Sequence, residues 1–406
     1  MTYYSRPYWL SRVPLSRRPS WPRFDDALAC EVVIVGGGLT GCAAAYLFAA
    51  SGARTCLVEA NRIGQGATAA GTGVIRPHPA ARFADLEQAR GRRAAWHVWE
   101  LSRHAALDFA ALVRRLRIRC DLEPRELFSI ARHDEDEALL QREHRAVSSA
   151  GLEAVWFTAV RLSRDLAVEA RCGLRMAGGA HIDPYPACLG FARAAQARGA
   201  RIFERTPVVR VRAGRAGVEV ETRGGPIAAR TVIIATGGPT TLFKPLQRHF
   251  RQLHTYLALT PPLDAARRRH AGRPGAVLTG AHEPSRVLAR TRDHRLLFAG
   301  ADQPQVPDRR RPKAVIQRTG QLMYELSLLY PDISGIQPDY GWDAAVAATA
   351  DGVMYAGPHR NYPHHLFALG VGHSGPAAAF LAAQILLRHD TGNPGSGDEA
   401  FGFNRA

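Results

Sequence analysis

The sequence has few cysteines, few lysines and no long apolar run. No Cys-x-x-Cys pair and no spacing typical of a metal site occurs among its six cysteines, at positions 30, 42, 56, 120, 172 and 188. Cys42 and Cys56 fall in an expected helix and an expected strand, where a small, buried core residue suits the pattern. These absences argue against a metal site and favour a reducing, cytoplasmic setting.

No segment has the apolar length that a membrane span requires. The longest apolar stretches, residues 43–50 and 377–387, are too short to cross a bilayer as helices. Residues 1–24 are rich in arginine, proline and aromatic residues, and they lack the apolar core of a secretory signal. We expect no membrane span, and we expect these residues to form an arm packed by Tyr3, Tyr4, Tyr8, Trp9 and Trp21.

Lysine occurs only at positions 244 and 313, so nearly all of the net charge of +17 comes from arginine. Such a charge can serve a nucleic acid or another anionic surface. Here the arginines are scattered through every segment, which favours a solvated basic surface over a nucleic-acid site. A small molecule is therefore the expected partner, and the oligomeric state stays open.

The stretch 32–59 has the pattern of a dinucleotide site. An apolar, β-branched run is followed by Gly36 and Gly38, which allow a tight turn and a close approach of the backbone to a pyrophosphate. Gly41 lets the alanine-rich helix that follows pack on the sheet. Glu59 closes the second strand, where an acid can bind the ribose hydroxyls. An acid at this place indicates an adenosine without a 2′-phosphate, as in NAD or FAD.

Two later stretches extend this pattern. Residues 60–77 form a loop of mostly small residues, whose backbone could pass close to a flat ligand. From residue 201 the apolar residues alternate with period two through a Gly224-Gly225 turn, which predicts a strand meander. The meander leads into a buried strand over 231–238 that ends in the second glycine pair, Gly237-Gly238.

These stretches resemble the D-amino-acid oxidase family of FAD-dependent amine oxidoreductases. Residues 62–77 are similar to its flavin loop, in which an R-x-G-x-G-A-S/T run precedes G-x-[IV]-x-P, and residues 178–186 are similar to its G-x-x-D-P segment. The strand over 231–238 is similar to the one that returns beside the first nucleotide strand and favours FAD over NAD. The likeness extends to members such as the glycine and sarcosine oxidases and gamma-glutamylputrescine oxidoreductase.

The resemblance implies an α/β fold with two parts. An FAD domain of the two-dinucleotide-binding type, with a Rossmann-like parallel sheet and a β-meander, would carry an inserted substrate domain built on an antiparallel sheet. At 406 residues the chain is long enough for both. We expect an N-terminal arm over 1–30 and a C-terminal tail over 393–406. The FAD domain would take 31–95, 165–240 and 337–392, and the substrate domain 96–164 and 241–336.

The resemblance also implies noncovalent FAD. Covalent relatives carry a histidine in the alanine-threonine run or a cysteine near the C-terminal glycines, and this sequence has neither. A helix that begins after Gly375 would point its N-terminus at the flavin. The cofactor-binding residues implied are Gly36, Gly38, Leu39, Thr40, Gly41, Glu59, Ala60, Gly66, Ala67, Thr68, Gly73, Val74, Val208, Ala235, Thr236, Gly237, Gly372, His373, Ser374 and Gly375.

By the same resemblance, an amine or amino acid would lose hydride from its α-carbon to the flavin and become an imine. The acceptor that reoxidises the flavin, oxygen or another, stays open. Three residues are the implied catalytic candidates: Arg76 and Arg290 for a substrate carboxylate, and His373 as a donor beside the flavin. The alternative for Arg290 is a surface arginine beside Asp293. The order Gly372-His373-Ser374-Gly375 departs from the commoner S-G-H-G of the family.

Two other classes of function remain as alternatives. A nucleic-acid-associated flavoprotein, such as a tRNA-modifying oxidoreductase, would use the net charge of +17. A flavin-binding subunit without turnover would explain why residues 287–300 and 342–357 depart from the family pattern at several positions.

Overall fold

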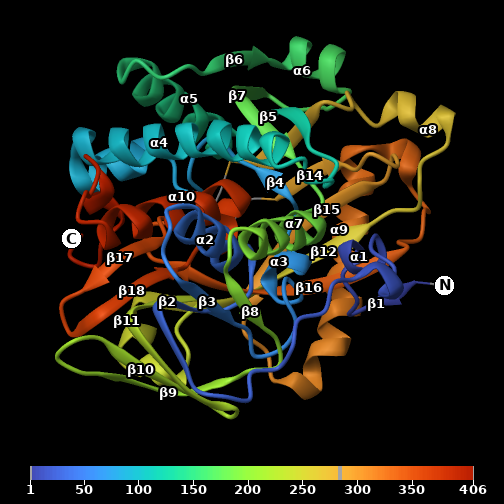
Figure 1. Cartoon of the computed structure of the whole chain (residues 1–406). Helices are drawn as coiled ribbons and strands as arrows, with labels where there is room; N and C mark the ends of the chain where they lie inside the picture. Colours follow the sequence, from blue (N-terminus) through green and yellow to red (C-terminus); the bar gives the residue numbers. More distant parts are fainter. Residues whose placement is uncertain (1, 282–285, 406) are drawn as a thin grey trace.

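The computed structural model describes residues 2–281 and 286–405, and their strands form two sheets (Figure 1). The sheet of eight strands has the order β17-β18-β11-β2-β3-β8, with β10 joining β11 and β9 joining β10. Five of them, β18, β11, β2, β3 and β8, run parallel, so we call it the parallel sheet. Its strands are β2 (Leu28–Val35), β3 (Thr55–Val58), β8 (Arg201–Phe203), β9 (Val208–Ala213), β10 (Val218–Thr222), β11 (Gly225–Gly237), β17 (Tyr355–His359) and β18 (Tyr362–Leu369).

The central strands of the parallel sheet are apolar along most of their length because both of their faces are covered. Val32–Val35 of β2 and Val232–Ala235 of β11 are all buried, as is typical of strands in the middle of a parallel sheet. The meander strand and the glycine-ending strand expected from the sequence are one continuous strand, β11. It pairs with β2 over its whole central part, so the expected return beside the first nucleotide strand is present.

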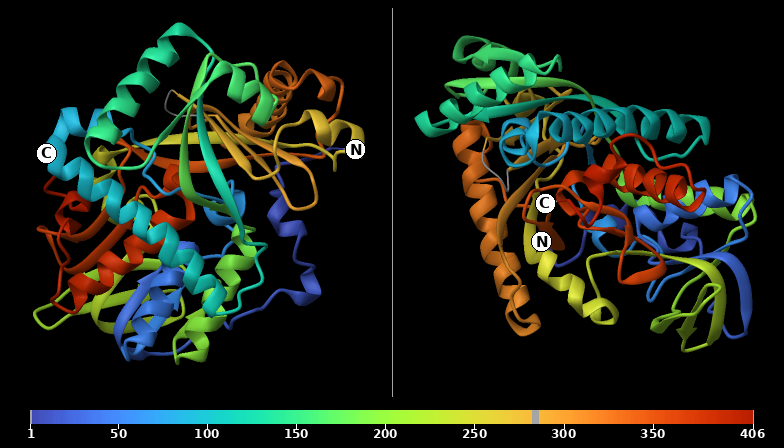
Figure 2. Two further views of the ribbon diagram at one scale, coloured as in Figure 1. Left: turned by 90° about the horizontal axis from the view of Figure 1, so that it is seen from above. Right: turned by 90° about the vertical axis from the view of Figure 1, so that its left-hand side faces the viewer.

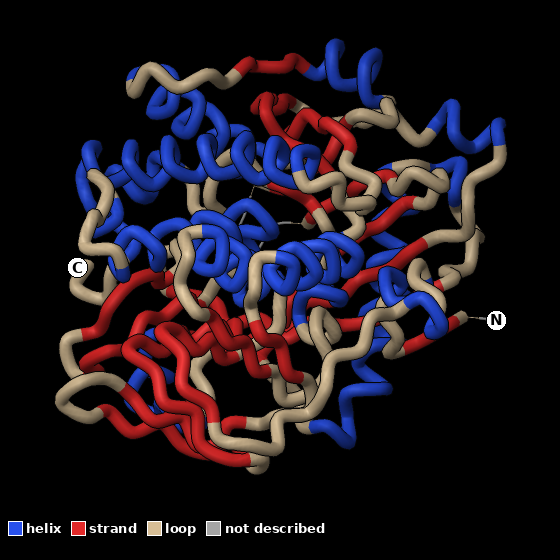
Figure 3. The backbone as a smooth tube through the Cα atoms, in the orientation of Figure 1, coloured by secondary structure: helices blue, strands red, loops and turns tan. Residues whose placement is uncertain are grey.

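Three helices cover one face of the parallel sheet (Figure 3). These are α2 (Leu39–Ala50), α7 (Pro184–Ala197) and α10 (Gly375–Asp390), with α2 packed between the other two. α2 packs closely because most of its core-facing residues are alanine or glycine. A long helix, α4 (Phe83–Arg115), lies over α10 and bends at Gly91, whose φ of 79° interrupts the helix.

The second sheet has ten strands and mixed directions, and we call it the mixed sheet (Figure 2). Its order is β1-β16-β12-β15-β14-β13-β5-β7-β4, with β6 on β7; β1–β16 and β13–β5 are parallel pairs. The strands are β1 (Tyr3–Tyr4), β4 (Val74–Ile75), β5 (Glu123–Ala131), β6 (Val155–Thr158), β7 (Cys172–His181), β12 (Phe250–Leu259), β13 (Ala276–Gly280), β14 (Val287–Arg290), β15 (Leu296–Pro304) and β16 (Tyr340–Thr349).

The helix α9 (Arg311–Leu329) packs on the face of β12, β15 and β16 that looks outward (Figure 2). It buries Val315, Leu322 and Leu326 against Tyr256 and Phe298 in a core of its own.

The remaining helices are α1 (Tyr8–Ser11), α3 (Ala67–Ala70), α5 (Asp134–Ser149), α6 (Ala159–Leu166) and α8 (Ala265–His270). Short 3₁₀ helices are η1 (Leu15–Arg17), η2 (Thr241–His249), η3 (Asp308–Arg310), η4 (Pro331–Ile333), η5 (Gly372–Ser374) and η6 (Asp398–Phe401). None of the helices within 2–281 and 286–405 is long and apolar enough to cross a bilayer.

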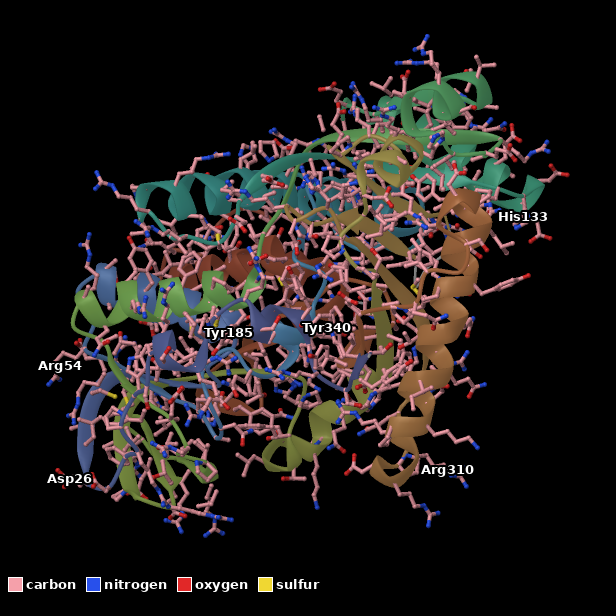
Figure 4. The ribbon with its side chains drawn as sticks, turned by 90° about the vertical axis from the view of Figure 1, so that its right-hand side faces the viewer. Asp26, Arg54, His133, Tyr185, Arg310 and Tyr340 are labelled. Atoms are coloured by element: carbon pink, nitrogen blue, oxygen red, sulfur yellow. The ribbon has the colours of Figure 1, made fainter. Side chains whose placement is uncertain are left out.

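The N-terminal arm is part of the mixed sheet. β1 adds to the edge of β16, and the rings of Tyr3 and Tyr8 lie 5.2 and 5.3 Å from the ring of Tyr340, which is labelled in Figure 4. Trp9 and Trp21 are fully buried, whereas Tyr3 and Tyr4 stay largely exposed. The arm is therefore fixed to the body through Tyr8 and the two tryptophans.

The expected domain segments do not follow the two sheets. β4, β7 and β16 belong to the mixed sheet, although their residues fall within the segments expected for the FAD domain. The helix α4 falls mostly in the expected substrate domain, yet it packs on α10 of the parallel sheet. A division into an FAD domain and a substrate domain thus stays a proposal, and its boundaries would need to move to respect the sheets.

Candidate functional site

A cavity of about 1510 Å³ lies where the carboxyl ends of the parallel strands face the mixed sheet. Its wall takes residues from the ends of β2, β3 and β11, from the loop 60–73, from β12, β15 and β16, and from the start of α10. The carboxyl ends of parallel strands are where ligands bind in open α/β sheets. The volume exceeds the roughly 300–1,000 Å³ of most ligand pockets, so a dinucleotide and a small substrate could both fit.

The glycines after β2 form a tight turn in which little room is left for side chains. Gly36 has a φ of 112°, and a Cβ there would lie 2.5 Å from the carbonyl oxygen of Ala235. A Cβ on Gly41 would lie 1.9 Å from the carbonyl oxygen of Gly36, so this glycine allows α2 to pack on the turn. A Cβ on Gly38 would meet Thr68 Oγ1 at 3.3 Å. Gly36 and Gly41 therefore serve the packing of the turn and of α2. Gly38 leaves open space at the N-terminus of α2.

The N-terminus of α2 opens into this cavity. Its first residue, Leu39, donates its backbone N–H to Thr68 Oγ1 at 2.9 Å, so the cap comes from the loop and not from Gly38, which has no side chain. Leu39 and Thr40 both line the cavity. Backbone N–H groups at the start of a helix, with the positive end of the helix dipole, are suited to bind a pyrophosphate.

Glu59 lies at the end of β3, on the wall of the cavity. Its carboxylate accepts hydrogen bonds from the backbone N–H groups of Gly37, at 2.7 Å, and Asn61, at 2.8 Å. These bonds fix the carboxylate, and each oxygen keeps a second lone pair with which to accept from a ribose hydroxyl. Val208 and Val209 of β9 line the cavity beside it.

The loop 60–73 is held by contacts from outside itself. Trp9 Nε1 donates to the carbonyl oxygen of Gly71 at 2.7 Å, and Trp342 Nε1 donates to that of Ala70 at 3.0 Å. His181 Nε2 lies 3.1 Å from the carbonyl oxygen of Thr72 and is placed to donate to it. At the start of the loop, Ile63 donates its backbone N–H to buried Glu204 at 2.8 Å. These bonds come from four different elements or loops, so the loop backbone is fixed before any ligand binds.

Two buried histidines stand near this loop. Burial, reinforced by the positive charge of Arg125, lowers the pKa of His181 to about 4. Burial, reinforced by Arg76, likewise lowers the pKa of His78 to about 4. Both rings are therefore neutral near pH 7. A neutral ring with its proton on Nε2 is the form of His181 that can hold the Thr72 carbonyl.

The mixed sheet forms the opposite wall with small or uncharged side chains. They are Gln252, Thr255 and Leu257 of β12, Ala299 and Gly300 of β15, and residues 344–347 of β16. No motif of the sequence singles out this set. The available signal is the alternation along β12, where Thr255 and Leu257 line the cavity and Tyr256 packs into the core on the other side. Over the described residues, the charged and titratable side chains of the wall are Glu59, Arg62, Arg76 and His373.

The start of α10 closes the cavity beside Arg76. Gly375 has a φ of 75°, and a Cβ there would lie 2.6 Å from the carbonyl oxygen of Val74, so the helix begins in contact with β4. Pro376 follows at the start of the helix, where its missing N–H costs nothing. Gly372, His373, Gly375 and Pro376 all line the cavity.

Most of the site residues predicted from the sequence line this cavity, and their roles in binding stay predictions. Arg76 and His373 are there among the catalytic candidates. The cofactor-binding candidates on the wall are Gly36, Gly38, Leu39, Thr40, Glu59, Ala60, Gly66, Ala67, Thr68, Gly73, Val208, Ala235, Thr236, Gly237, Gly372, His373 and Gly375.

Three of the predicted cofactor residues lie behind the wall. Gly41 is turned to the Gly36 carbonyl and acts in packing. Val74 pairs with His181 inside the mixed sheet. Ser374 is buried and faces a separate small space that it shares with His78. Each lies next to a lining residue in the sequence.

Arg290 does not face the cavity, and its prediction as a substrate-binding residue is wrong. Its side chain is 5% exposed, and its Nη2 donates to the carbonyl oxygens of Ala271, at 2.8 Å, and Gly272, at 3.0 Å. Burial lowers its pKa. The alternative of a surface arginine beside Asp293 is wrong as well, since Asp293 accepts from Tyr8 and Arg295. Arg290 instead ties the segment 271–272 to β14.

Comparisons with known proteins agree with this geometry. A family model described as "FAD dependent oxidoreductase" (DAO) matches residues 31–388. The probable oxidoreductase OrdL of Rhizobium meliloti (strain 1021) is 24% identical over 343 residues, which cover 82% of this chain and 77% of that protein. The glycine oxidase of Bacillus subtilis (strain 168) is 24% identical over 374 residues, which cover 89% and 94%.

The fold has a close match among solved structures. The crystal structure of glycine oxidase from Geobacillus kaustophilus superposes with a TM-score of 0.77 at 20% identity, covering 93% of this chain and 99% of that one. The α/β fold class expected from the sequence is thereby confirmed.

Proposed function

Because the chain belongs to the DAO family of FAD-dependent oxidoreductases, we propose that it binds FAD noncovalently in this cavity and oxidises the C–N bond of a small amine or amino acid. FAD is the cofactor of the family, and when bound it supplies the acceptor for the two electrons. The observation that carries the proposal is the single cavity that joins the glycine turn of β2, the small-residue loop 60–73 and the uncharged wall of the mixed sheet.

The residues present fit FAD along its length. The Gly36–Gly38 turn and the start of α2 suit the pyrophosphate, and Glu59 suits the ribose. The backbone of residues 66–73, fixed by Trp9, Trp342 and His181, would lie along the flat ring system. The small side chains at 299–300 and 344–345 leave the space that a planar group needs.

In this chain the protein would hold and orient the substrate. Gln252, Thr255 and Gln305 offer uncharged donors and acceptors on the wall of the mixed sheet. Arg76 is 7% exposed and lines the cavity near the start of α10, where it is the candidate to bind a substrate carboxylate. The glycine oxidases among the relatives support an amino acid or amine as the substrate.

A first experiment tests the cofactor. The purified protein is precipitated with acid, and the absorbance and identity of the flavin are measured in the supernatant and the pellet. Free FAD in the supernatant is the expected result. Yellow colour that stays with the pellet would contradict noncovalent binding, and FMN in the supernatant would contradict the assignment of Glu59 to an adenosine ribose.

A second experiment tests the reaction. FAD-loaded protein is mixed without oxygen with a panel of primary amines, secondary amines, amino acids and matched 2-hydroxy acids, while the flavin absorbance is followed. We expect bleaching by one class of amine and none by the hydroxy acids. Arg76→Ala should raise the half-saturating concentration of a carboxylated amine by about tenfold or more, and that of its uncharged analogue much less, because one charged hydrogen bond is lost. Bleaching by hydroxy acids alone, or by nothing, would overturn the proposal.

A further inference from the structure

A β-bulge interrupts the pairing of β12 with β15 beside the cavity. His254 pairs with Gln303 and Tyr256 pairs with Gly300, so Thr255 alone on β12 stands opposite both Ala301 and Asp302 on β15. Ala301 has a φ of 55°, a left-handed conformation that L-residues with a Cβ disfavour, and it is 4% exposed. Bulges of this kind redirect a side chain and are frequent next to active sites.

The side chain that this bulge redirects is Asp302. Its Oδ1 accepts a hydrogen bond from Thr255 Oγ1 at 2.6 Å, and its Oδ2 lies 3.4 Å from Nε2 of His373. The side chain of Asp302 is 4% exposed and that of His373 is 23% exposed. The bulge thus brings a carboxylate from the mixed sheet to the histidine that precedes α10.

Asp302 Oδ2 and His373 Nε2 are close enough for an ion pair but are not aligned for a hydrogen bond. Asp302 Oδ2 and His373 Nε2 are both buried, and neither has a hydrogen-bond partner among residues 2–281 and 286–405. A buried carboxylate is stable only when a charge or a donor compensates it. Thr255 compensates Oδ1, and the His373 ring, 3.4 Å from Oδ2, is placed to compensate the other oxygen.

We propose that Asp302 is a positioning residue that holds His373 as its ion-pair partner and directs the other ring nitrogen, Nδ1, into the cavity. In an imidazolium both nitrogens carry protons, so Nδ1 would present a donor beside the N-terminus of α10. There it adds to the helix dipole in stabilising negative charge that develops on the reduced cofactor. The inference rests on the proposed binding of FAD in this cavity.

A second buried carboxylate in the same sheet provides a matched control. Asp343 of β16 lies on the opposite face, where its Oδ2 is 2.5 Å from His254 Nδ1 and accepts from Arg311 Nε at 2.8 Å. It is 2% exposed and does not line the cavity. Asp343 therefore matches Asp302 in chemistry and burial and differs in the face of the sheet that it serves.

The test is the affinity of the bound flavin for sulfite, which adds to the ring and leaves negative charge on it. FAD-loaded wild type, Asp302→Asn, His373→Gln and the double variant are titrated with sulfite, and the dissociation constant is read from the flavin absorbance. Each single variant should bind sulfite about tenfold more weakly, as expected for the loss of one charged hydrogen bond. The double variant should be no weaker than either single one, since both changes remove the same donor. Thr255→Val, which loosens Asp302, should weaken binding less, and Asp343→Asn should change it by less than about twofold.

The sign of the Asp302→Asn effect separates two roles. If Asp302 acted only through its own negative field, its removal would tighten sulfite binding. The proposal would be overturned by tighter sulfite binding in Asp302→Asn, or by effects of the two single variants that multiply in the double variant. It would also be overturned by an equal effect of Asp343→Asn, or by a wild type that holds FAD but binds no sulfite. If Asp302→Asn does not fold, the same comparison is made with Thr255→Val and His373→Gln. A wild type that holds no FAD would refute the proposed function itself.

Discussion

Single residues of the glycine turn have separable tasks, and substitutions can tell them apart. A Cβ at position 41 would stand 1.9 Å from the Gly36 carbonyl oxygen, so Gly41→Ala must push α2 away from the sheet. We expect this variant to lose about 2–4 kcal/mol of stability, as for overpacking in a rigid core. Gly38 has only Thr68 Oγ1 nearby, so Gly38→Val should keep most of the stability of the apoprotein but lose FAD.

The measurements are urea unfolding of the apoprotein and retention of FAD on gel filtration. Gly320→Ala is the control: the residue lies inside α9, a Cβ there meets nothing within 4 Å, and helix propensity predicts a gain of roughly 1 kcal/mol. If Gly38→Val retained FAD as well as wild type does, the pyrophosphate would not lie at this turn.

Three buried titratable residues with large pKa shifts contribute to the response to acid in opposite senses. The folded pKa values of His78 and His181 are about 4, below the ordinary 6.5, so the unfolded chain takes up these protons first. Each histidine therefore removes on the order of 3 kcal/mol of stability as the pH falls from 6.5 to 4. Asp183 acts in the opposite sense: burial raises its pKa from 3.8 to about 6, so its protonation adds a similar amount between pH 6 and 3.8.

Two histidines outweigh one aspartate, so together these three residues should lower the free energy of unfolding by roughly 3 kcal/mol between pH 6.5 and 4. The check is urea unfolding at several pH values across this range. His181→Gln should remove about half of the histidine contribution, and the exposed His104→Gln is the control that should leave the profile unchanged. A profile that rises toward pH 4 would mean that Asp183 dominates.

At the scale of elements, the loop 60–73 depends on contacts from distant parts of the chain. Trp9→Phe keeps a large ring in a fully buried site and removes the hydrogen bond to Gly71. The carbonyl left without a partner costs about 1–3 kcal/mol, and the loop loses one of its outside anchors. We expect FAD to dissociate about tenfold faster, as measured by dilution and flavin fluorescence. Trp96→Phe, on the exposed side of α4, should leave the rate unchanged.

The sequence predicts the local features of the fold and the site better than those that depend on distant contacts. The β2–α2–β3 unit follows from a strand, a glycine turn and a helix within 28 residues, 32–59, so its pattern is complete in one stretch. The wall of the mixed sheet is different, because alternation along β12 divides its residues into two faces but does not say which face meets the cavity. Packing of α9 against Tyr256 decides it.

Two features of the site could not be predicted, for one physical reason. Arg290 and Asp302 lie on consecutive strands, β14 and β15. The family resemblance assigns Arg290 to the substrate, and no motif singles out Asp302. The direction of Arg290 depends on the carbonyl groups at 271 and 272, and that of Asp302 on a bulge at Ala301. Neither a distant carbonyl nor a non-glycine residue at positive φ leaves a signal in the local sequence.

For the molecule as a whole, the cavity wall joins both sheets, so a bound cofactor should stabilise them together. Free FAD at 100 times its dissociation constant should add about 2.7 kcal/mol to the free energy of unfolding. For a chain of this size we expect one calorimetric transition that moves upward by a few degrees. Two transitions, of which FAD moves only one, would show that the parallel and mixed sheets unfold separately.

The pairing of β1 with β16 has a consequence for how the chain is made. Thr2 Oγ1 donates to the carbonyl oxygen of Pro338, 336 residues further along the chain. At about 5–20 residues per second, a ribosome needs on the order of 20 s to a minute to cover that distance. β2 likewise waits for β11 before its second edge is paired. The aromatic arm, made long before β16, is thus among the last segments to dock, and the alanine-rich surface of α2 likewise stays uncovered until α7 and α10 are made.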